Sequence, residues 1–364
     1  MEDKVKIIAF HLPQYHQIPE NDAWWGEGFT EWTNVKKAIP LFAGHQQPKK
    51  PLNGFYYDMT DHAARVWQAN LAQKYGIYGF CYYHYWFDGK LLLEKPLEAL
   101  LREKDIGLPF CLCWANEPWA RTWDGKGNQI LIEQRYGKEA EWLDHFSYLE
   151  PFLRDSRYIR INNKPVIVIY RSSSIKCYDE MMQCWREEGR KRGIGELYII
   201  DENNSFQNHY ETAGSDAVLY LEPMYTIQYG RSVWEKVIQR IKSRTKGLRY
   251  QNNIHYYNYD ELWRNILRRK ENGSKTAYPG AFVGWDNTPR KGKRGVVIEG
   301  ATPEKFQQYM QRQMEHAKQA GSEYLFLNAW NEWAEGTYLE PDEDHSYQYL
   351  EAIAKLMQEK SQER

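Results

Sequence analysis

The chain has 364 residues, with 48 basic and 49 acidic side chains and a formal net charge of −1. This length is enough for one large domain or two small ones with a substantial core. The even charge balance gives no reason to expect nucleic acid or an anionic membrane as partner. No window approaches the roughly 18 apolar residues of a membrane span, so we expect no membrane insertion.

The composition is rich in amphipathic rings, with 15 Trp and 28 Tyr. Such rings stack on flat apolar faces and hydrogen-bond hydroxyl groups, so they suit a carbohydrate groove as well as an aromatic core. Of the five cysteines, Cys81, Cys111 and Cys113 lie in apolar runs and indicate buried thiols without metal-type spacing. The N-terminus is charged at once and develops no signal-like stretch, which predicts a cytoplasmic protein or one whose export signal has been removed.

Short β-branched runs alternate with longer amphipathic stretches along the chain. Several runs are nearly uniformly apolar, as in KPVIVIYR, which favours strands covered on both faces. Two helices are clear from their ends: 60–76 begins at a capping Thr or Asp and stops at glycine, and 302–321 begins Thr-Pro and stops at glycine. The predicted strands are residues 5–12, 77–83, 109–115, 165–170, 197–201, 217–221, 281–285 and 324–329.

Eight strands separated by helices predict a (β/α)8 TIM barrel, a fold that usually takes about 250 residues and grows by insertions in its loops. We expect one glycosidase-like domain over residues 1–364, with the surplus length in two long loops, 13–59 and 223–277. The second of these loops contains a basic helix. A doubly wound open sheet is the alternative fold.

Active sites of such barrels form at the carboxyl ends of the strands. Nearly every predicted strand is followed by an aromatic ring together with a carboxylate, amide or imidazole, which predicts a sugar-binding cleft. The partner we expect is therefore an oligosaccharide or polysaccharide. The candidate substrate-binding residues are His11, Tyr15, His84, Trp86, Asn116, Glu117, Trp119, Arg121, Trp123, Glu222, Tyr225, Trp285, Trp330 and Asn331.

The stretch NAWNEWAEGTYLEPD, residues 328–342, holds the candidate catalytic pair. Glycoside cleavage needs a proton donor for the leaving oxygen and a second carboxylate. Glu332 and Glu335 follow the last predicted strand, beside two tryptophans and before Gly336, which allows a tight turn. Indoles can raise the pKa of one acid by desolvation, while amides and an arginine keep the other ionised. Two glutamates three residues apart in sequence are common on solvated helices, but the position of this pair at a strand exit favours a catalytic role.

Glu117, in Asn116-Glu117-Pro118, is the rival catalytic carboxylate. An Asn-Glu pair at a strand exit resembles the acid/base motif of the large (β/α)8 clan of retaining glycosidases. That clan places the pair after the fourth strand, whereas here it follows the third predicted strand. The alternative for Glu117 is a residue that binds a sugar hydroxyl.

We expect no metal and no cofactor. His11, His84, Glu117 and Asp201 could together hold a divalent ion, but a histidine at a strand end is more often structural or substrate-binding. No Gly-rich phosphate loop and no GxGxxG follows the first strand. The basic run RKGKRG, residues 290–295, is most simply a solvated loop, and its alternative is a contact with an acidic glycan or a diphosphate.

Four long stretches together resemble a known family. They are IIAFHLPQYHQIPEND followed by WWGEGFTEW, then GFCYYHYWFDGK, CWANEPWARTWDG and NAWNEWAEGTYLEPD. They are similar to the WbsX-type proteins, which are often found with polysaccharide biosynthesis genes and labelled glycosyltransferases. That family is grouped as similar to glycoside hydrolase family 99, the endo-α-mannosidases and endo-α-mannanases. The resemblance runs from Ile7 to about Glu351.

The resemblance implies a mechanism. The family 99 hydrolases are (β/α)8 barrels that cleave α-mannosidic links with retention and without a metal. Their two glutamates match Glu332, as the base that takes the proton of the sugar's own 2-hydroxyl, and Glu335, as the general acid and later base. The reaction passes through a 1,2-anhydro sugar. HLPQYH and NEPWARTWDG depart from the hydrolase pattern, which leaves the substrate open.

Three functions therefore stand side by side. The first is a retaining endo-acting α-glycoside hydrolase, and the acid pair favours it. The second is a glycosyltransferase or transglycosidase in surface polysaccharide (O-antigen or capsule) biosynthesis. The absence of a phosphate loop counts against a nucleotide-sugar transferase. The third is a glycan-binding barrel without activity.

Overall fold

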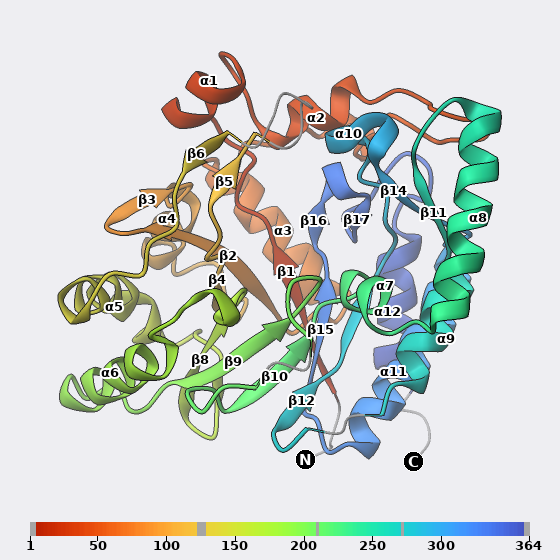
Figure 1. Cartoon of the computed structure of the whole chain (residues 1–364). Helices are drawn as coiled ribbons and strands as arrows, with labels where there is room; N and C mark the ends of the chain where they lie inside the picture. The colour runs from red at the N-terminus through yellow and green to blue at the C-terminus, as the bar shows by residue number, and fades with distance from the viewer. Residues whose placement is uncertain (1–4, 122–128, 209–210, 271–272, 360–364) are drawn as a thin grey trace.

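Parallel strands form the central barrel of the computed structural model, which describes residues 5–121, 129–208, 211–270 and 273–359 (Figure 1). Their order around the sheet is β12-β10-β9-β8-β4-β2-β1-β15-β13. The strands are β1 (Lys6–His11), β2 (Gly79–Phe87), β4 (Phe110–Trp114), β8 (Lys164–Ile169), β9 (Tyr198–Asn203), β10 (Ala217–Tyr220), β12 (Thr276–Tyr278), β13 (Gly280–Phe282) and β15 (Tyr324–Asn328).

The barrel closes through β12 and β13, which are two halves of one strand interrupted at Pro279. β12 pairs with β10, and β13 pairs with β15. Proline has no N–H to give to a ladder, so the pairing changes partner there. Eight strand positions result, and the predicted (β/α)8 barrel is confirmed.

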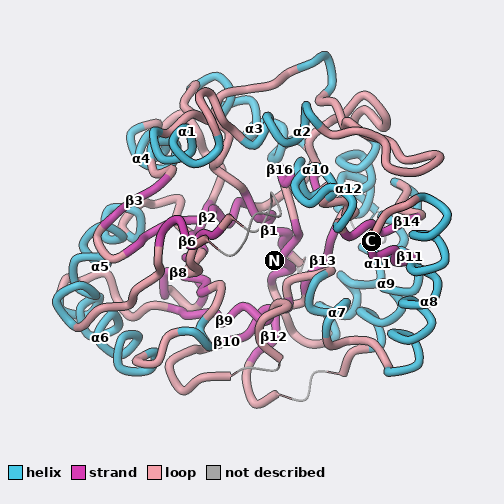
Figure 2. Tube along the Cα trace, turned by 45° about the horizontal axis from the view of Figure 1, so that its top comes forward, coloured by secondary structure: helices cyan, strands magenta, loops and turns pink. Residues whose placement is uncertain are grey.

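Helices surround the strands, as Figure 2 shows. Both predicted helices are present: Asp61 caps α3 by accepting from the N–H of Ala63, and Thr302 caps α11 by accepting from the N–H of Lys305. None of the described helices combines the length and the apolar character that crossing a lipid bilayer requires. The outer helices are α3 (His62–Lys74), α4 (Lys95–Arg102), α5 (Glu139–Leu153), α6 (Tyr178–Lys191), α9 (Tyr259–Arg268), α11 (Pro303–Gln319) and α12 (Gln348–Glu359).

The two long loops carry most of the remaining elements. The first loop contains α1 (Pro19–Trp25) and α2 (Glu31–Lys37), and the sixth contains α7 (Met224–Gln228), α8 (Val233–Tyr250) and β11 (His255–Asn258). Other short elements are β3 (Lys90–Leu92), β5 (Trp119–Ala120), β6 (Ile130–Ile132), β7 (Arg160–Ile161), α10 (Thr288–Lys291), β14 (Val296–Glu299), β16 (Asn331–Glu332), β17 (Thr337–Tyr338) and the 3₁₀ helices η1 (Leu52–Gly54), η2 (Ser172–Ser174), η3 (Gly292–Arg294) and η4 (Trp333–Glu335).

One strand lies earlier than predicted. The seventh strand was expected at 281–285, and the structure has it at 276–282, as β12 and β13. The apolar run continues past the strand because Val283 and Trp285 line a cavity outside the ladder. Cys81, Cys111 and Cys113 are buried on β2 and β4, as predicted.

Candidate active site

One guanidinium holds three carboxylates at the exit of the eighth strand. Arg290, on α10, places Nη1 2.8 Å from Oε1 of Glu335 and Nη2 3.3 Å from Oε2 of Glu332. The same Nη2 lies 3.1 Å from Oε2 of Glu31, the first residue of α2. The sequence pair Glu332 and Glu335 is therefore brought together, and two residues from distant loops complete the cluster.

The cluster is withdrawn from water. Glu31 is fully buried, and the Glu335 side chain is the most open of the four, at 22% exposed. Burial raises the pKa of Glu332 to about 8; the charges of Glu335 and Glu31 act in the same direction, and Arg290 opposes them. Glu332 therefore binds a proton more readily than an exposed glutamate does. Among the described residues, Oε1 of Glu31 has no hydrogen-bond partner.

The backbone after Glu335 turns through Gly336. This glycine has φ +65°, and a Cβ there would lie 2.7 Å from the backbone nitrogen of Asp286. The close approach allows the Asp286 N–H to donate to the Glu335 carbonyl at 2.7 Å. Oδ1 of Asp286 also accepts from the N–H and hydroxyl of Thr288, at 3.0 and 2.6 Å. Asp286 therefore joins the loop of Glu335 to the start of the helix that carries Arg290.

A fully buried carboxylate, Glu340, organises the closing motif. Trp330 and Trp333 donate their indole N–H groups to it at 3.0 and 2.7 Å. Gln68 and the Tyr57 hydroxyl donate at 2.7 and 2.9 Å. Burial raises the pKa of Glu340 to about 7. The indole N–H groups of the motif thus bind this supporting carboxylate.

Two further predicted residues, Tyr15 and Asn331, fasten the first loop to the closing motif. Asn331 accepts from the Leu12 N–H at 2.7 Å and donates to the Leu12 carbonyl at 3.0 Å. The Tyr15 hydroxyl donates to the Asn331 carbonyl. The charges of Glu31 and Glu332 help to raise the pKa of Tyr15, after its burial. Tyr15 therefore lies beside the carboxylate cluster, although it is almost fully buried.

Glu117 follows the third barrel strand, as expected, and interacts electrostatically with Glu335. Burial raises the pKa of Glu117 to about 7, Arg171 opposes the rise, and the charge of Glu335 adds to it. Asn116 fixes this turn by accepting from the Arg171 N–H at 2.8 Å and donating to the Arg171 carbonyl at 3.0 Å. Glu117 is thus a second protonatable group near the acid pair.

Trp119 and Arg121 continue this side of the site. The Trp119 ring lies 5.3 Å from that of Tyr85 and 5.8 Å from that of Trp24. Arg121 donates to the Trp24 carbonyl and lies 5.8 Å from the Trp25 ring. Both residues therefore pack on the first loop. Trp123, also a predicted substrate-binding residue, lies outside the described residues.

His11, His84 and Trp86 are bonded to the helices around the barrel. His11 shares a 3.0 Å hydrogen bond with Gln68 of α3. His84 lies 2.9 Å from the ring nitrogen of His145 on α5, and Trp86 stacks on the same ring at 4.6 Å. Burial lowers the pKa of His11 and of His84 to about 3, so both rings are neutral. The structure does not bring these three residues to the carboxylate cluster.

Tyr83 and Tyr85 point to the opposite face of β2 from His84 and Trp86. Successive side chains of a strand point to opposite sides. Tyr83 and Tyr85 alternate with His84 and Trp86, and the charge of Glu332 contributes to raising the pKa of both tyrosines, after their burial. These two rings, which the sequence reasoning missed, are the ones near the site. Strand parity was the signal that could have found them.

Glu222 and Tyr225 form a separate group after the sixth strand. Glu222 is fully buried and ion-paired with Arg269. Its Oε1 also accepts from the Thr226 hydroxyl at 3.0 Å. The Arg269 guanidinium lies 4.8 Å from the Tyr225 ring. Both predicted residues are thus engaged with the sixth loop.

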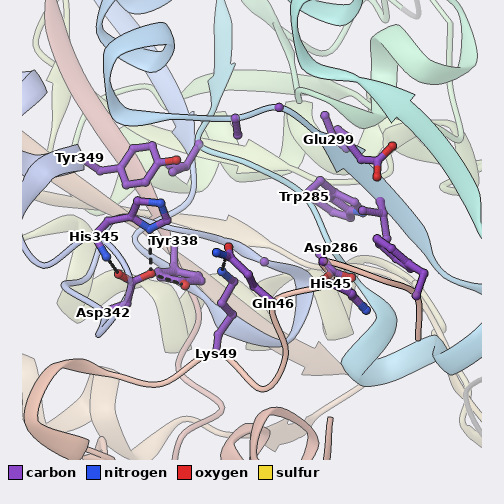
Figure 3. A pocket seen from close by; sticks show the side chains of 18 residues that line it. His45, Gln46, Lys49, Trp285, Asp286, Glu299, Tyr338, Asp342, His345 and Tyr349 are labelled. Carbon is purple, nitrogen blue, oxygen red and sulfur yellow. Dashed lines mark hydrogen bonds and ion pairs between the residues drawn. The ribbon is translucent and has the colours of Figure 1, made fainter. Parts of the chain in front are cut away.

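Trp285 lines a cavity of about 330 Å³ beside the carboxylate cluster (Figure 3). Its indole is 6% exposed, and among the described residues its N–H has no hydrogen-bond partner. Gly336 and Asp286 form part of the lining, so the loop that carries Glu335 is one wall. Tyr338, Tyr349 and Lys49 also line the cavity.

An Asp-x-Asp spacing that sequence reasoning passed over lies at the edge of this cavity, which Asp342 and His345 line. Asp342 and Asp344 lie in the closing motif, and their carboxylates and a His345 ring nitrogen come within 4.8 Å of one another. Nucleotide-sugar transferases use such spacing to hold a metal-bound diphosphate. Here Asp344 is paired with Lys49 at 2.6 Å, and Asp342 accepts from the Tyr338 hydroxyl at 2.7 Å. Oδ2 of each aspartate is therefore already engaged within the protein.

The other possible metal set is not assembled. His11 and His84 bind different helices, and Asp201 accepts from the hydroxyls of Tyr178 and Thr212. Within the described ranges, the Asp342, Asp344 and His345 group is the one set of three such side chains that come together.

Arg290 corrects the interpretation of the basic run. RKGKRG was expected to be a solvated loop, and Lys293 and Arg294 are indeed exposed. Arg290 instead has a side chain only 10% exposed and binds three carboxylates. A long arginine side chain can reach inward from a short surface helix, and no periodic pattern marks this. Glu31, in GFTEW, was missed because its own strand exit lies twenty residues earlier.

Comparison with known proteins places these features in a family. The family model described as Glycosyltransferase WbsX matches residues 7–353. The WxcX proteins of two Xanthomonas campestris pv. campestris strains, B100 and ATCC 33913, are each 36% identical over 96% of this chain. The match covers 49% of their own length, so the chain spans about half the length of these relatives.

Solved structures share the fold. A family 99 endo-α-mannosidase from Bacteroides thetaiotaomicron, in complex with bis-tris-propane, matches with a TM-score of 0.60 and 15% identity, over 99% of this chain and 97% of that one. A glycoside hydrolase-like protein matches with the same TM-score and identity, over 98% and 94%. At this identity the likeness shows the fold alone. Because the family model matches nearly the whole chain, the chain belongs to the WbsX family.

Proposed function

We propose that the protein is a retaining, endo-acting α-glycoside hydrolase for a mannose-containing or related bacterial polysaccharide. The observation that carries the proposal is the arginine-bridged pair, Glu332 and Glu335, at the barrel exit. The raised pKa of Glu332 suits a base that takes and returns a proton, and Glu335, bound to the other nitrogen of the same guanidinium, is placed to act as the acid. This is the division of labour that glycoside cleavage needs.

In the first step, Glu332 takes the proton of the sugar's 2-hydroxyl. The 2-oxygen then attacks the anomeric carbon, and the bond from that carbon to the leaving oxygen breaks. Glu335 gives its proton to the leaving oxygen. The products are a 1,2-anhydro sugar and a free chain end. Arg290 binds both carboxylates and so balances the charge that moves between them.

In the second step, Glu335 takes a proton from water. The water oxygen attacks the anomeric carbon, the three-membered ring opens, and Glu332 returns its proton to the 2-oxygen. Each step inverts the anomeric carbon, so the overall outcome is retention.

This route restricts the substrate. The attacking 2-oxygen must lie trans to the leaving oxygen, which α-mannosides satisfy and α-glucosides do not. Rings and donors around the 330 Å³ cavity at Trp285 offer a place for a further sugar unit of the chain. Stacking on indole and bonding to its unpaired N–H suit a polyhydroxylated ring.

Transfer is the second candidate function. The family description and the Asp342-x-Asp344 spacing favour it. A retaining hydrolase that accepts a sugar hydroxyl in place of water is a transglycosidase, and it would use the same two glutamates. A nucleotide-sugar transferase would use the aspartates instead.

The test is a glycan-release assay followed by mass spectrometry. Purified protein is mixed with α-mannan, with related α-linked bacterial polysaccharides and, separately, with nucleotide sugars plus acceptor. We expect short oligosaccharides whose release is lost in Glu332→Gln and Glu335→Gln. Substrates with hydrogen in place of the 2-hydroxyl should not react. Consumption of nucleotide sugar without release from any polysaccharide would establish the transferase.

A further inference from the structure

The helix α8 carries its apolar side chains on the outside of the molecule. Figures 1 and 2 both show it along the outer edge of the fold, away from the barrel strands. The residues of its inward face are small or polar: Gln239, Ser243 and Gly247 are buried. Six apolar side chains are between 41% and 77% exposed, namely Val233, Trp234, Val237, Ile238, Ile241 and Leu248. We call these six residues the α8 stripe.

Polar bonds fix this inverted orientation. Ser243 accepts from the Tyr256 N–H at 2.9 Å, and Gln239 donates to the Tyr256 carbonyl at 3.2 Å. A Cβ at Gly247 would meet the Asn252 carbonyl oxygen at 2.5 Å, so only glycine allows this approach. The helix also has a full capping box between Ser232 and Glu235. The stripe is therefore presented to solvent by a well-formed helix.

Basic residues border the stripe on both sides. Of the charged residues of α8, six are Lys or Arg and one is Glu. At 100° per residue, Arg240 and Arg244 fall along one edge of the stripe, and Lys242 and Arg249 along the other. In the described part of the chain, no ion pair is formed by Arg240, Arg244 or Arg249, whereas Lys242 has Glu261 at 3.6 Å.

We propose that α8 docks the protein on an anionic lipid membrane. An apolar stripe containing Trp, flanked by Lys and Arg, is the pattern of a helix that lies flat in the interface, with the stripe at the headgroup–acyl boundary. The unpaired arginines would then meet lipid phosphates. A second copy of this chain fits less well, because face-to-face stripes would bring like-charged edges together.

The test uses the whole protein and vesicles, without any glycan, so its result is independent of the proposed hydrolysis. Co-sedimentation is measured with phosphatidylglycerol–phosphatidylethanolamine vesicles and with phosphatidylcholine vesicles. We expect binding to the anionic vesicles that falls at least tenfold in Trp234→Gln/Ile241→Gln/Leu248→Gln. Arg240→Gln/Arg244→Gln/Arg249→Gln should remove the preference for anionic lipid. Salt near 1 M, where the Debye length is about 3 Å, should weaken binding.

The matched control is Ile39→Gln/Phe55→Gln, which removes two apolar side chains, 64% and 43% exposed, from elsewhere on the surface. It should bind as the wild type does, and circular dichroism should show every variant folded. Equal binding to both vesicle types, or binding that the α8 substitutions leave unchanged, overturns the proposal. So does a lipid-free dimer that dissociates in the Trp234 variant, since a second copy would then cover the stripe.

Discussion

At the scale of single residues, Arg290 has the largest expected effect. Arg290→Gln leaves Glu31 buried without its cation, and breaking a buried pair from one side costs about 3–5 kcal/mol. We expect a loss of unfolding free energy of this size in urea denaturation, and a fall in kcat/KM of about 100-fold or more. Adding Glu31→Gln should restore part of the stability. Lys293→Gln, an exposed residue of the same basic run, is the control and should change neither quantity.

The raised pKa of Glu332 predicts a pH profile. Burial raises the pKa of Glu332 to about 8, so below this pH Glu332 is protonated and cannot act as the base. We expect kcat/KM to fall as the pH falls through about 8. Glu31→Gln removes a neighbouring negative charge, which favours ionisation of Glu332 and should move this fall to lower pH. If the pH at which kcat/KM falls is the same in Glu31→Gln, the charge of Glu31 does not affect the pKa of Glu332.

At the scale of elements, the turn after Glu335 is the place where a small substitution should most affect activity. Gly336→Ala adds the cost of a positive φ, about 1–2 kcal/mol, and a clash with the Asp286 nitrogen. The clash should displace Glu335 and lower kcat at least tenfold. Gly321→Ala is the matched control, since Gly321, after α11, has φ +70° and nothing within 4 Å of its Cβ position. It should lose stability in thermal melts and keep its activity; equal losses of activity would contradict the role given to the turn.

Apolar runs mark where a strand lies in the sequence, and this was enough to predict the eight barrel positions. They do not show which side chains face the site, which is why the sequence predicts His84 and Trp86 on β2 rather than Tyr83 and Tyr85. Pro279 marks the division of the seventh strand. The apolar run beyond Pro279 led to a predicted strand that begins and ends too far along the chain. Loop residues that line a cavity and strand residues that line a core look alike in sequence.

At the scale of the whole molecule, the net charge does not show where the charged residues lie. The near-zero net charge gave no reason to expect an anionic membrane, yet α8 holds six basic residues and one acidic one. In the same way, the acid pair was visible in one motif, while its partners Glu31 and Arg290 come from loops about 260 residues apart. A local motif predicts the residues that follow one strand. Only the closed barrel shows which of the loops after the strands come together to form a site.

Metal removal separates the two candidate functions for the whole enzyme. The carboxylates of Asp342 and Asp344 are engaged by Tyr338 and Lys49, and the proposed hydrolysis uses only Glu332 and Glu335 as acid and base. We expect EDTA to leave both glycan release and the melting temperature unchanged. Asp344→Asn, which loses only the ion pair with Lys49, should retain activity. Turnover that EDTA abolishes and Mn²⁺ or Mg²⁺ restores, with the same loss in Asp344→Asn, would instead assign the chemistry to the Asp-x-Asp pair. The protein would then be a metal-dependent transferase, and the glutamate cluster would position the acceptor sugar.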